Sequence, residues 1–136
     1  MDVIMKILLA YNGTNVSKSA LKLARDHAQV FDAEVVILTS SEGGSHETAK
    51  DILNIQENIT FAKQFMAAKN IVCETHEMAR GLSPGEDIVQ FAAEHDIDQI
   101  YVGIKKRSRV QKLIMGSTAQ YVILKAKCPV ISVNYE

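Results

Sequence analysis

The stretch VIMKILLAYNGTNVSKSALKLARDHAQVFDAEVVILTS, residues 3–40, contains a strand pattern, a helix pattern and a second strand pattern in that order. Its two ends, residues 3–11 and 34–40, are short runs rich in Ile, Leu and Val, which are typical of buried strands. Between them, apolar residues recur every three or four positions from Ala20 to Phe31, as in an amphipathic helix. This succession predicts a right-handed crossover that joins two parallel strands.

The same alternation continues to the end of the chain. Helix patterns cover residues 48–69, 84–95 and 118–125, and strand patterns cover residues 71–78, 99–103 and 129–133. Ser83, Pro84 and Glu86 form a capping box at the start of one helix. The strand at 71–78 alternates apolar and polar residues, which indicates a place at the sheet edge. The expected fold is an α/β, doubly wound, Rossmann-like, five-stranded parallel sheet with helices on both faces, in one domain spanning 1–136.

Composition restricts the classes of function. The chain has 136 residues, of which 47% are hydrophobic and 23% charged, so it has the composition of a folded globular protein. Its formal net charge of −1 argues against a protein that coats nucleic acid or an anionic membrane. No apolar run is long enough to cross a bilayer, and no secretory signal is recognisable. Cys73 and Cys128 are far apart in apolar stretches and are predicted to be buried, reduced thiols, which favours a cytoplasmic location.

The stretch GIKKRSRVQKLIMGST, residues 103–118, is the best candidate for a ligand site. Gly103 is expected to let the backbone turn sharply and to let a ligand approach closely. Gly116 and Ser117 open a helix, where free backbone N–H groups and the helix dipole favour a phosphate. Five cations lie between them, namely Lys105, Lys106, Arg107, Arg109 and Lys112. Alternatively, Gly116 and Ser117 form a plain helix cap and the basic residues form a solvated loop.

The sequence resembles the universal stress protein family over nearly its whole length. KILLAYNGTNVSKSALKLA (6–24), IDQIYVG (97–103), GST (116–118) and CPVISV (128–133) occur in the family's order and spacing. Nucleotide-binding members carry Gly-x2-Gly-x9-Gly-[Ser/Thr], and Gly103, Gly116 and Ser117 match the first glycine, the third glycine and the hydroxyl. Lys106 replaces the second glycine, and Asn12 replaces the acidic residue that follows the first strand.

The resemblance implies an adenine nucleotide as ligand, either ATP, ADP or AMP, with or without Mg. It places the site at the carboxyl ends of the first and fourth strands. Ala10, Ser40 and Val102 would line the adenosine pocket, and core packing is the simpler explanation for Ala10 and Val102. Thr118 would be a third donor at the helix start. Lys106 would be strained if its position needs a positive φ, and otherwise could add its N–H and ammonium to a phosphate.

Several functions therefore stay open. The first is a stress-response or regulatory protein that binds a nucleotide with little or no catalysis. The second, motivated by Asn12 and Lys106, is a dimeric interaction module that binds protein partners and no nucleotide. The resemblance implies a homodimer formed through the last strand, residues 129–135. The third is an enzyme with slow ATP hydrolysis or nucleotidyl transfer, although no catalytic residue or metal motif is recognisable. Nucleic-acid binding through residues 105–112 is the weakest alternative, because no stacking aromatic residues accompany the cations.

Overall fold

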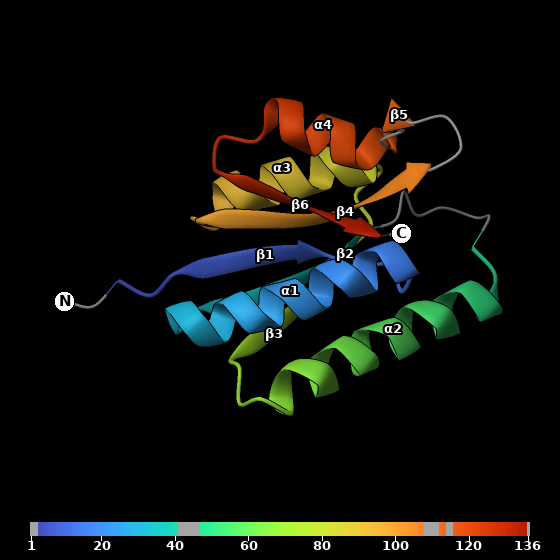
Figure 1. Cartoon of the computed structure of the whole chain (residues 1–136). Coiled ribbons are helices and arrows are strands. Elements are labelled where there is room, and N and C mark those ends of the chain that lie inside the picture. The colour runs from blue at the N-terminus through green and yellow to red at the C-terminus, as the bar shows by residue number, and fades with distance from the viewer. Residues whose placement is uncertain (1–2, 41–46, 108–111, 114–115, 136) are drawn as a thin grey trace.

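The computed structural model describes residues 3–40, 47–107, 112–113 and 116–135. Strands and helices alternate along the chain (Figure 1). The strands are β1 (Lys6–Ala10), β2 (Glu34–Ser40), β3 (Cys73–Met78), β4 (Gln99–Arg107), β5 (Lys112–Leu113) and β6 (Val130–Tyr135). The helices are α1 (Asn15–Phe31), α2 (Ala49–Ala67), α3 (Pro84–Glu94) and α4 (Ser117–Lys125).

Five of the strands form a parallel sheet in the order β3-β2-β1-β4-β6. The central strand is β1, because Ile7 is paired with Val35 of β2 on one side and with Gln99 of β4 on the other. The chain moves outward from β1 to β3 and then returns to the opposite side of β1. The winding therefore reverses between β1 and β4, the position where doubly wound sheets bind ligands. The predicted fold class is confirmed.

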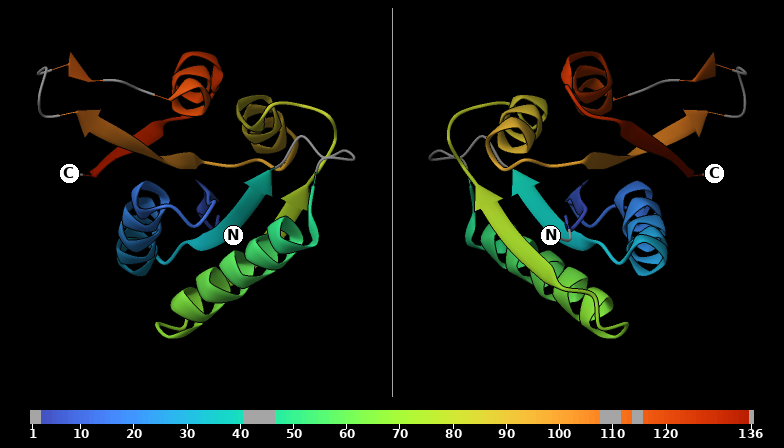
Figure 2. Two further views of the ribbon diagram at one scale, coloured as in Figure 1. Left: turned by 90° about the vertical axis from the view of Figure 1, so that its right-hand side faces the viewer. Right: turned by 90° about the vertical axis from the view of Figure 1, so that its left-hand side faces the viewer.

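Helices cover both faces of the sheet. Figures 1 and 2 show α1 and α2 on one face and α3 and α4 on the other. Ile7 and Leu9 point into the core under α1 and α2, whereas Leu8 points into the core under α3 and α4. Because successive strand residues point to opposite faces, a strand covered on both sides is apolar throughout. The edge strand β3 has no fully buried residue, with Glu74 and Glu77 exposed and its other positions half-buried, and its place at the sheet edge is as the sequence predicts.

Polar caps set the starts of the helices. The Ser83 hydroxyl accepts the Glu86 N–H, and the Glu86 carboxylate accepts the Ser83 N–H, so the predicted capping box of α3 is confirmed. Thr48 and Asp51 form a second capping box at α2, and the hydrogen bonds from Thr48 lower the pKa of the Asp51 carboxyl. At α1, Thr14 accepts the Ser17 N–H at 3.2 Å. Such caps replace hydrogen bonds that the first turn of a helix lacks.

The end of β4 differs from the prediction. Gly103 was expected to end the strand, but the strand continues to Arg107. The extension pairs with β6 as far as Lys105 beside Tyr135, and Ile104 within it is buried. Arg107 then pairs with Lys112, so that β5 forms an antiparallel ladder on β4 instead of the predicted loop. The cations of this segment suggested a solvated loop, whereas pairing with distant β6 extends the strand.

The two cysteines lie on opposite sides of the sheet. Cys73 packs against the core under α1 and α2, and Cys128 packs against the core under α3 and α4. Both are free thiols, and they are half-buried, not fully buried as predicted. Burial raises the pKa of the Cys73 thiol to about 11 and also raises the pKa of Cys128. Both side chains are therefore protonated and weakly nucleophilic near neutral pH.

Candidate functional site

A cavity of about 320 Å³ opens at the carboxyl ends of β1, β2 and β4, beside the first turns of α1, α3 and α4. Its volume falls in the range of about 300–1000 Å³ that is typical of ligand sites. Eight of the predicted site residues line it, namely Ala10, Asn12, Ser40, Val102, Gly103, Gly116, Ser117 and Thr118. Residues from both halves of the chain therefore meet at the point where the sheet reverses its winding.

Lys106 occupies a strand position, where its backbone pairs with Leu113. A strand has an extended backbone, so this position does not impose the left-handed conformation that would strain a lysine. The Lys106 side chain lies outside the described part of the structure. The same holds for the side chains of Lys105, Arg107 and Lys112, and for the whole of Arg109.

The N-terminus of α4 is open toward the cavity. Gly116 is its N-cap residue and provides no side-chain hydrogen bond, and the first turn contains no acidic residue. The first hydrogen bond within the helix joins the Gln120 N–H to the Gly116 carbonyl, so the preceding N–H groups have no partner inside the helix. A Cβ built on Gly116 would meet no atom of the described residues within 4 Å. These donors and the helix dipole form a site suited to an anion.

The loop between β1 and α1 forms another wall of the cavity. Asn12 accepts two hydrogen bonds through Oδ1, from the Thr14 N–H at 3.2 Å and from the Thr14 hydroxyl at 2.7 Å. This amide oxygen is therefore engaged within the loop, and the amide N–H donors of Asn12 remain. Tyr11 precedes Asn12 and is 2% exposed, and this burial raises the pKa of its hydroxyl.

Asn58 of α2 holds this loop from outside, and sequence reasoning did not identify it. Its side-chain amide donates to the Asn12 carbonyl at 3.2 Å. The same side chain lies over Gly13, whose φ of 81° is a conformation that favours glycine. No local pattern marks Asn58, because its partners lie more than forty residues away in the chain.

The sharp turn predicted at Gly103 is wrong, because this residue lies within β4, paired with Val133. A Cβ at this position would lie 2.4 Å from Val16 Cγ1 and 2.4 Å from the Val16 carbonyl oxygen. The absence of a side chain therefore lets the first turn of α1 pack directly on β4. Gly103 still lines the cavity, but the close approach that requires glycine is that of the protein backbone.

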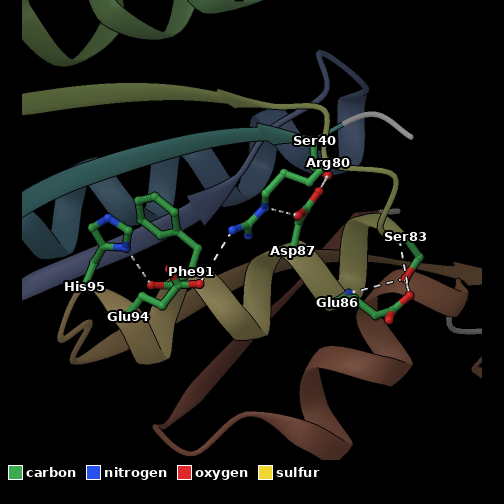
Figure 3. A network of polar contacts seen from close by, with 8 residues as sticks. All are labelled: Ser40, Arg80, Ser83, Glu86, Asp87, Phe91, Glu94 and His95. Carbon is green, nitrogen blue, oxygen red and sulfur yellow. Dashed lines mark hydrogen bonds and ion pairs between the residues drawn. The ribbon is translucent and has the colours of Figure 1, made fainter. Parts of the chain in front are cut away.

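A buried carboxylate is hydrogen-bonded to Ser40, which lines the cavity (Figure 3). Asp87, on the first turn of α3, is fully buried and accepts the Ser40 hydroxyl. It also accepts the Arg80 Nε–H at 3.0 Å, which provides the opposite charge that a buried carboxylate needs. Sequence reasoning missed Asp87. The available signal was its position four residues before Phe91, on the helix face that contains the buried Ile88.

The described residues contain no group of three or more His, Cys, Asp or Glu side chains that could hold a metal ion. Among the described helices, none has the length and apolar character required to cross a lipid bilayer. The chemistry that the described residues bring to the cavity is hydrogen bonding at helix N-termini and packing against apolar side chains.

Comparisons with known proteins agree on one family. The model of the universal stress protein family matches residues 4–134. A universal stress protein of Methanocaldococcus jannaschii is 30% identical over 139 residues, with 95% of this chain and 81% of the relative covered. A solved universal stress protein of Archaeoglobus fulgidus is 33% identical with a TM-score of 0.84, over 96% of this chain and 94% of the other.

A second solved universal stress protein of Archaeoglobus fulgidus is 28% identical, with a TM-score of 0.78. The similarity covers 98% of this chain and 99% of the other, and that protein was solved in complex with dAMP.

Proposed function

This chain belongs to the universal stress protein family, and on that premise we propose that it binds an adenine nucleotide in the cavity at the ends of β1 and β4. The observation that carries the proposal is the open N-terminus of α4, where Gly116 leaves backbone donors facing the cavity. The relative solved with dAMP supports the same class of ligand. Binding would stabilise the folded protein and so serve a regulatory role in a stress response, with little or no catalysis.

The lining of the cavity differs in character from element to element. At the start of α4, Gly116, Ser117 and Thr118 offer donors to the phosphates. On β2 and α3, Leu38, Pro84 and Ile88 provide apolar side chains for the base. AMP, ADP and ATP share both features, and ATP would bring Mg coordinated largely by its own phosphates.

AMP at millimolar concentration is expected to raise the melting temperature of the purified chain by several degrees. At a concentration 100 times Kd, a ligand stabilises the folded state by about 2.7 kcal/mol, and a shift of roughly 2–8 °C per kcal/mol is usual at this size. Differential scanning fluorimetry with AMP, and with ATP in the presence and absence of Mg, measures the effect. Adenosine is the control for the phosphate contribution. If none of the nucleotides shifts the transition, the nucleotide proposal is contradicted, and the alternative of a protein-interaction module is favoured.

We further propose a homodimer formed through β6. This strand pairs with β4 and lies at the end of the parallel sheet, where unpaired backbone groups can meet a second copy. Light scattering of the purified chain is expected to give twice the mass of 15.0 kDa. A strictly monomeric mass across micromolar concentrations would contradict the dimer.

The free, half-buried thiols on opposite faces of the sheet support a location in the reducing cytoplasm. Fractionation of cells that produce the chain tests this proposal, and recovery outside the cytoplasm would contradict it.

A further inference from the structure

Ser40 links the cavity to the buried carboxylate of Asp87. Ser40 lines the cavity at the end of β2, and its hydroxyl is hydrogen-bonded to Asp87 Oδ2. Arg80 holds the other carboxylate oxygen, Oδ1, through its Nε–H at 3.0 Å. The Arg80 guanidinium also lies 3.6 Å from the Glu94 carboxylate, so it is positioned from two sides (Figure 3).

The donors and acceptors of this network fix how Ser40 can interact with a ligand. A hydroxyl has one hydrogen to donate and lone pairs that accept. A carboxylate paired with a guanidinium only accepts, so the hydrogen of Ser40 is directed to Asp87. The hydroxyl can therefore offer only a lone pair to the cavity. Asp87 thus makes Ser40 a hydrogen-bond acceptor toward the cavity, without itself contacting the ligand.

The position of Ser40 indicates which part of a nucleotide it meets. The phosphate donors at Gly116 and Ser117 belong to α4, whereas Ser40 belongs to β2, which is separated from β4 by β1. Near the β2 end, the cavity is lined by apolar side chains from β2 and α3, including Leu38 and Ile88. A flat, largely apolar base fits this end, and Ser40 is the polar side chain that β2 contributes to it.

We propose that Asp87 acts through Ser40 as a positioning residue that selects purines with an amino group at C6 over purines with a carbonyl group there. The inference rests on the proposed nucleotide function. An amino group donates to the Ser40 lone pair, whereas a carbonyl oxygen places a second acceptor against it and leaves both unpaired. Unpaired polar groups in a closed site are costly, and rejection on this basis is often at least tenfold.

AMP and IMP provide the test, since they differ in the C6 substituent and the associated N1 proton. Isothermal titration is expected to give AMP a Kd about tenfold lower than that of IMP for the unchanged chain. For Ser40→Ala the Kd of IMP divided by the Kd of AMP is expected to fall to about two or less, mainly because AMP binds more weakly. A ratio that Ser40→Ala leaves unchanged overturns the proposal, as does equal or tighter binding of IMP by the unchanged chain.

Asp87→Asn tests the indirect role of the carboxylate. The amide can donate to Ser40 and thereby free the hydroxyl hydrogen for the cavity. The Kd of IMP divided by the Kd of AMP is therefore expected to fall as in Ser40→Ala. In the Ser40→Ala background, Asp87→Asn is expected to change the ratio no further, because Asp87 acts only through Ser40. A separate effect in that background overturns the indirect role.

Glu86→Gln is the matched control. It makes the same change from carboxylate to amide on the same turn of α3, but Glu86 contacts Ser83 and does not line the cavity. It is expected to lower stability slightly and to leave the ratio unchanged, and a ratio that falls as in Asp87→Asn overturns the assignment to Asp87. Failure of the unchanged chain to bind either nucleotide at millimolar concentration overturns both the inference and the proposed function. AMP binding without discrimination overturns the inference alone.

Discussion

Gly116→Asp is expected to lower the affinity for AMP by about 100-fold while the fold stays at least as stable. The aspartate side chain would cap the open N-terminus of α4 and accept the N–H groups available for a phosphate. Its negative charge would also repel the phosphate, and the combined loss corresponds to about 2.7 kcal/mol. The folded state gains instead, by a few tenths of a kcal/mol, because Asp is a better N-cap than Gly and complements the helix dipole.

Opposite signs for binding and stability make this experiment decisive. Isothermal titration measures the affinity, and urea unfolding measures the free energy of unfolding. A Cβ at position 116 meets no atom of the described part of the chain within 4 Å, so a side chain there clashes with none of those residues. Gly116→Asn is the control, because asparagine caps the helix without the charge, and its affinity loss is expected to be about tenfold smaller. Unchanged AMP affinity in Gly116→Asp would show that the phosphate binds elsewhere.

Gly103→Ala is expected to destabilise the chain by about 3 kcal/mol or more. The new methyl group would lie 2.4 Å from both Val16 Cγ1 and the Val16 carbonyl oxygen, so α1 would have to move away from β4. Domains of this size are stable by only about 5–15 kcal/mol, which makes the loss a large fraction of the total. Urea unfolding of the two proteins measures the difference directly.

Two further variants locate the cause of this loss. Val16→Ala combined with Gly103→Ala removes the clash with the Val16 side chain but leaves the clash with its carbonyl oxygen, so only part of the stability should return. Gly116→Ala, where the added methyl group meets none of the described atoms within 4 Å, is expected to change stability by less than about 1 kcal/mol. Full stability of Gly103→Ala with loss of AMP binding would assign the glycine to the ligand, not to packing.

Local patterns in the sequence predict most of the fold. Apolar runs identify the strands that are covered on both faces, and the alternating run of β3 identifies a sheet edge. Ser83 and Glu86 mark the start of α3 because a capping box depends only on nearby residues. The end of β4 was predicted wrongly because its last part is stabilised by pairing with β6, which is distant in sequence.

The same distinction applies to the cavity. Gly116 and Ser117 could be identified because a helix start has a local signature, and a doubly wound sheet places that start beside β1. The contacts of Asp87 and Asn58 could not be identified, because their partners Ser40 and Asn12 lie 47 and 46 residues away, and only the burial of Asp87 had a local signal. The role of Gly103 was also hidden, since only the structure shows that Val16 approaches it from α1.

The placement of the two cysteines gives each helical layer its own internal reporter. Cys73 packs against the core under α1 and α2, and Cys128 packs against the core under α3 and α4. The neighbouring side chains slow alkylation of a half-buried thiol, so its labelling rate rises when the packing of that layer loosens. Different labelling rates at the two positions would indicate that each layer opens independently. Equal rates would indicate cooperative unfolding of the whole domain.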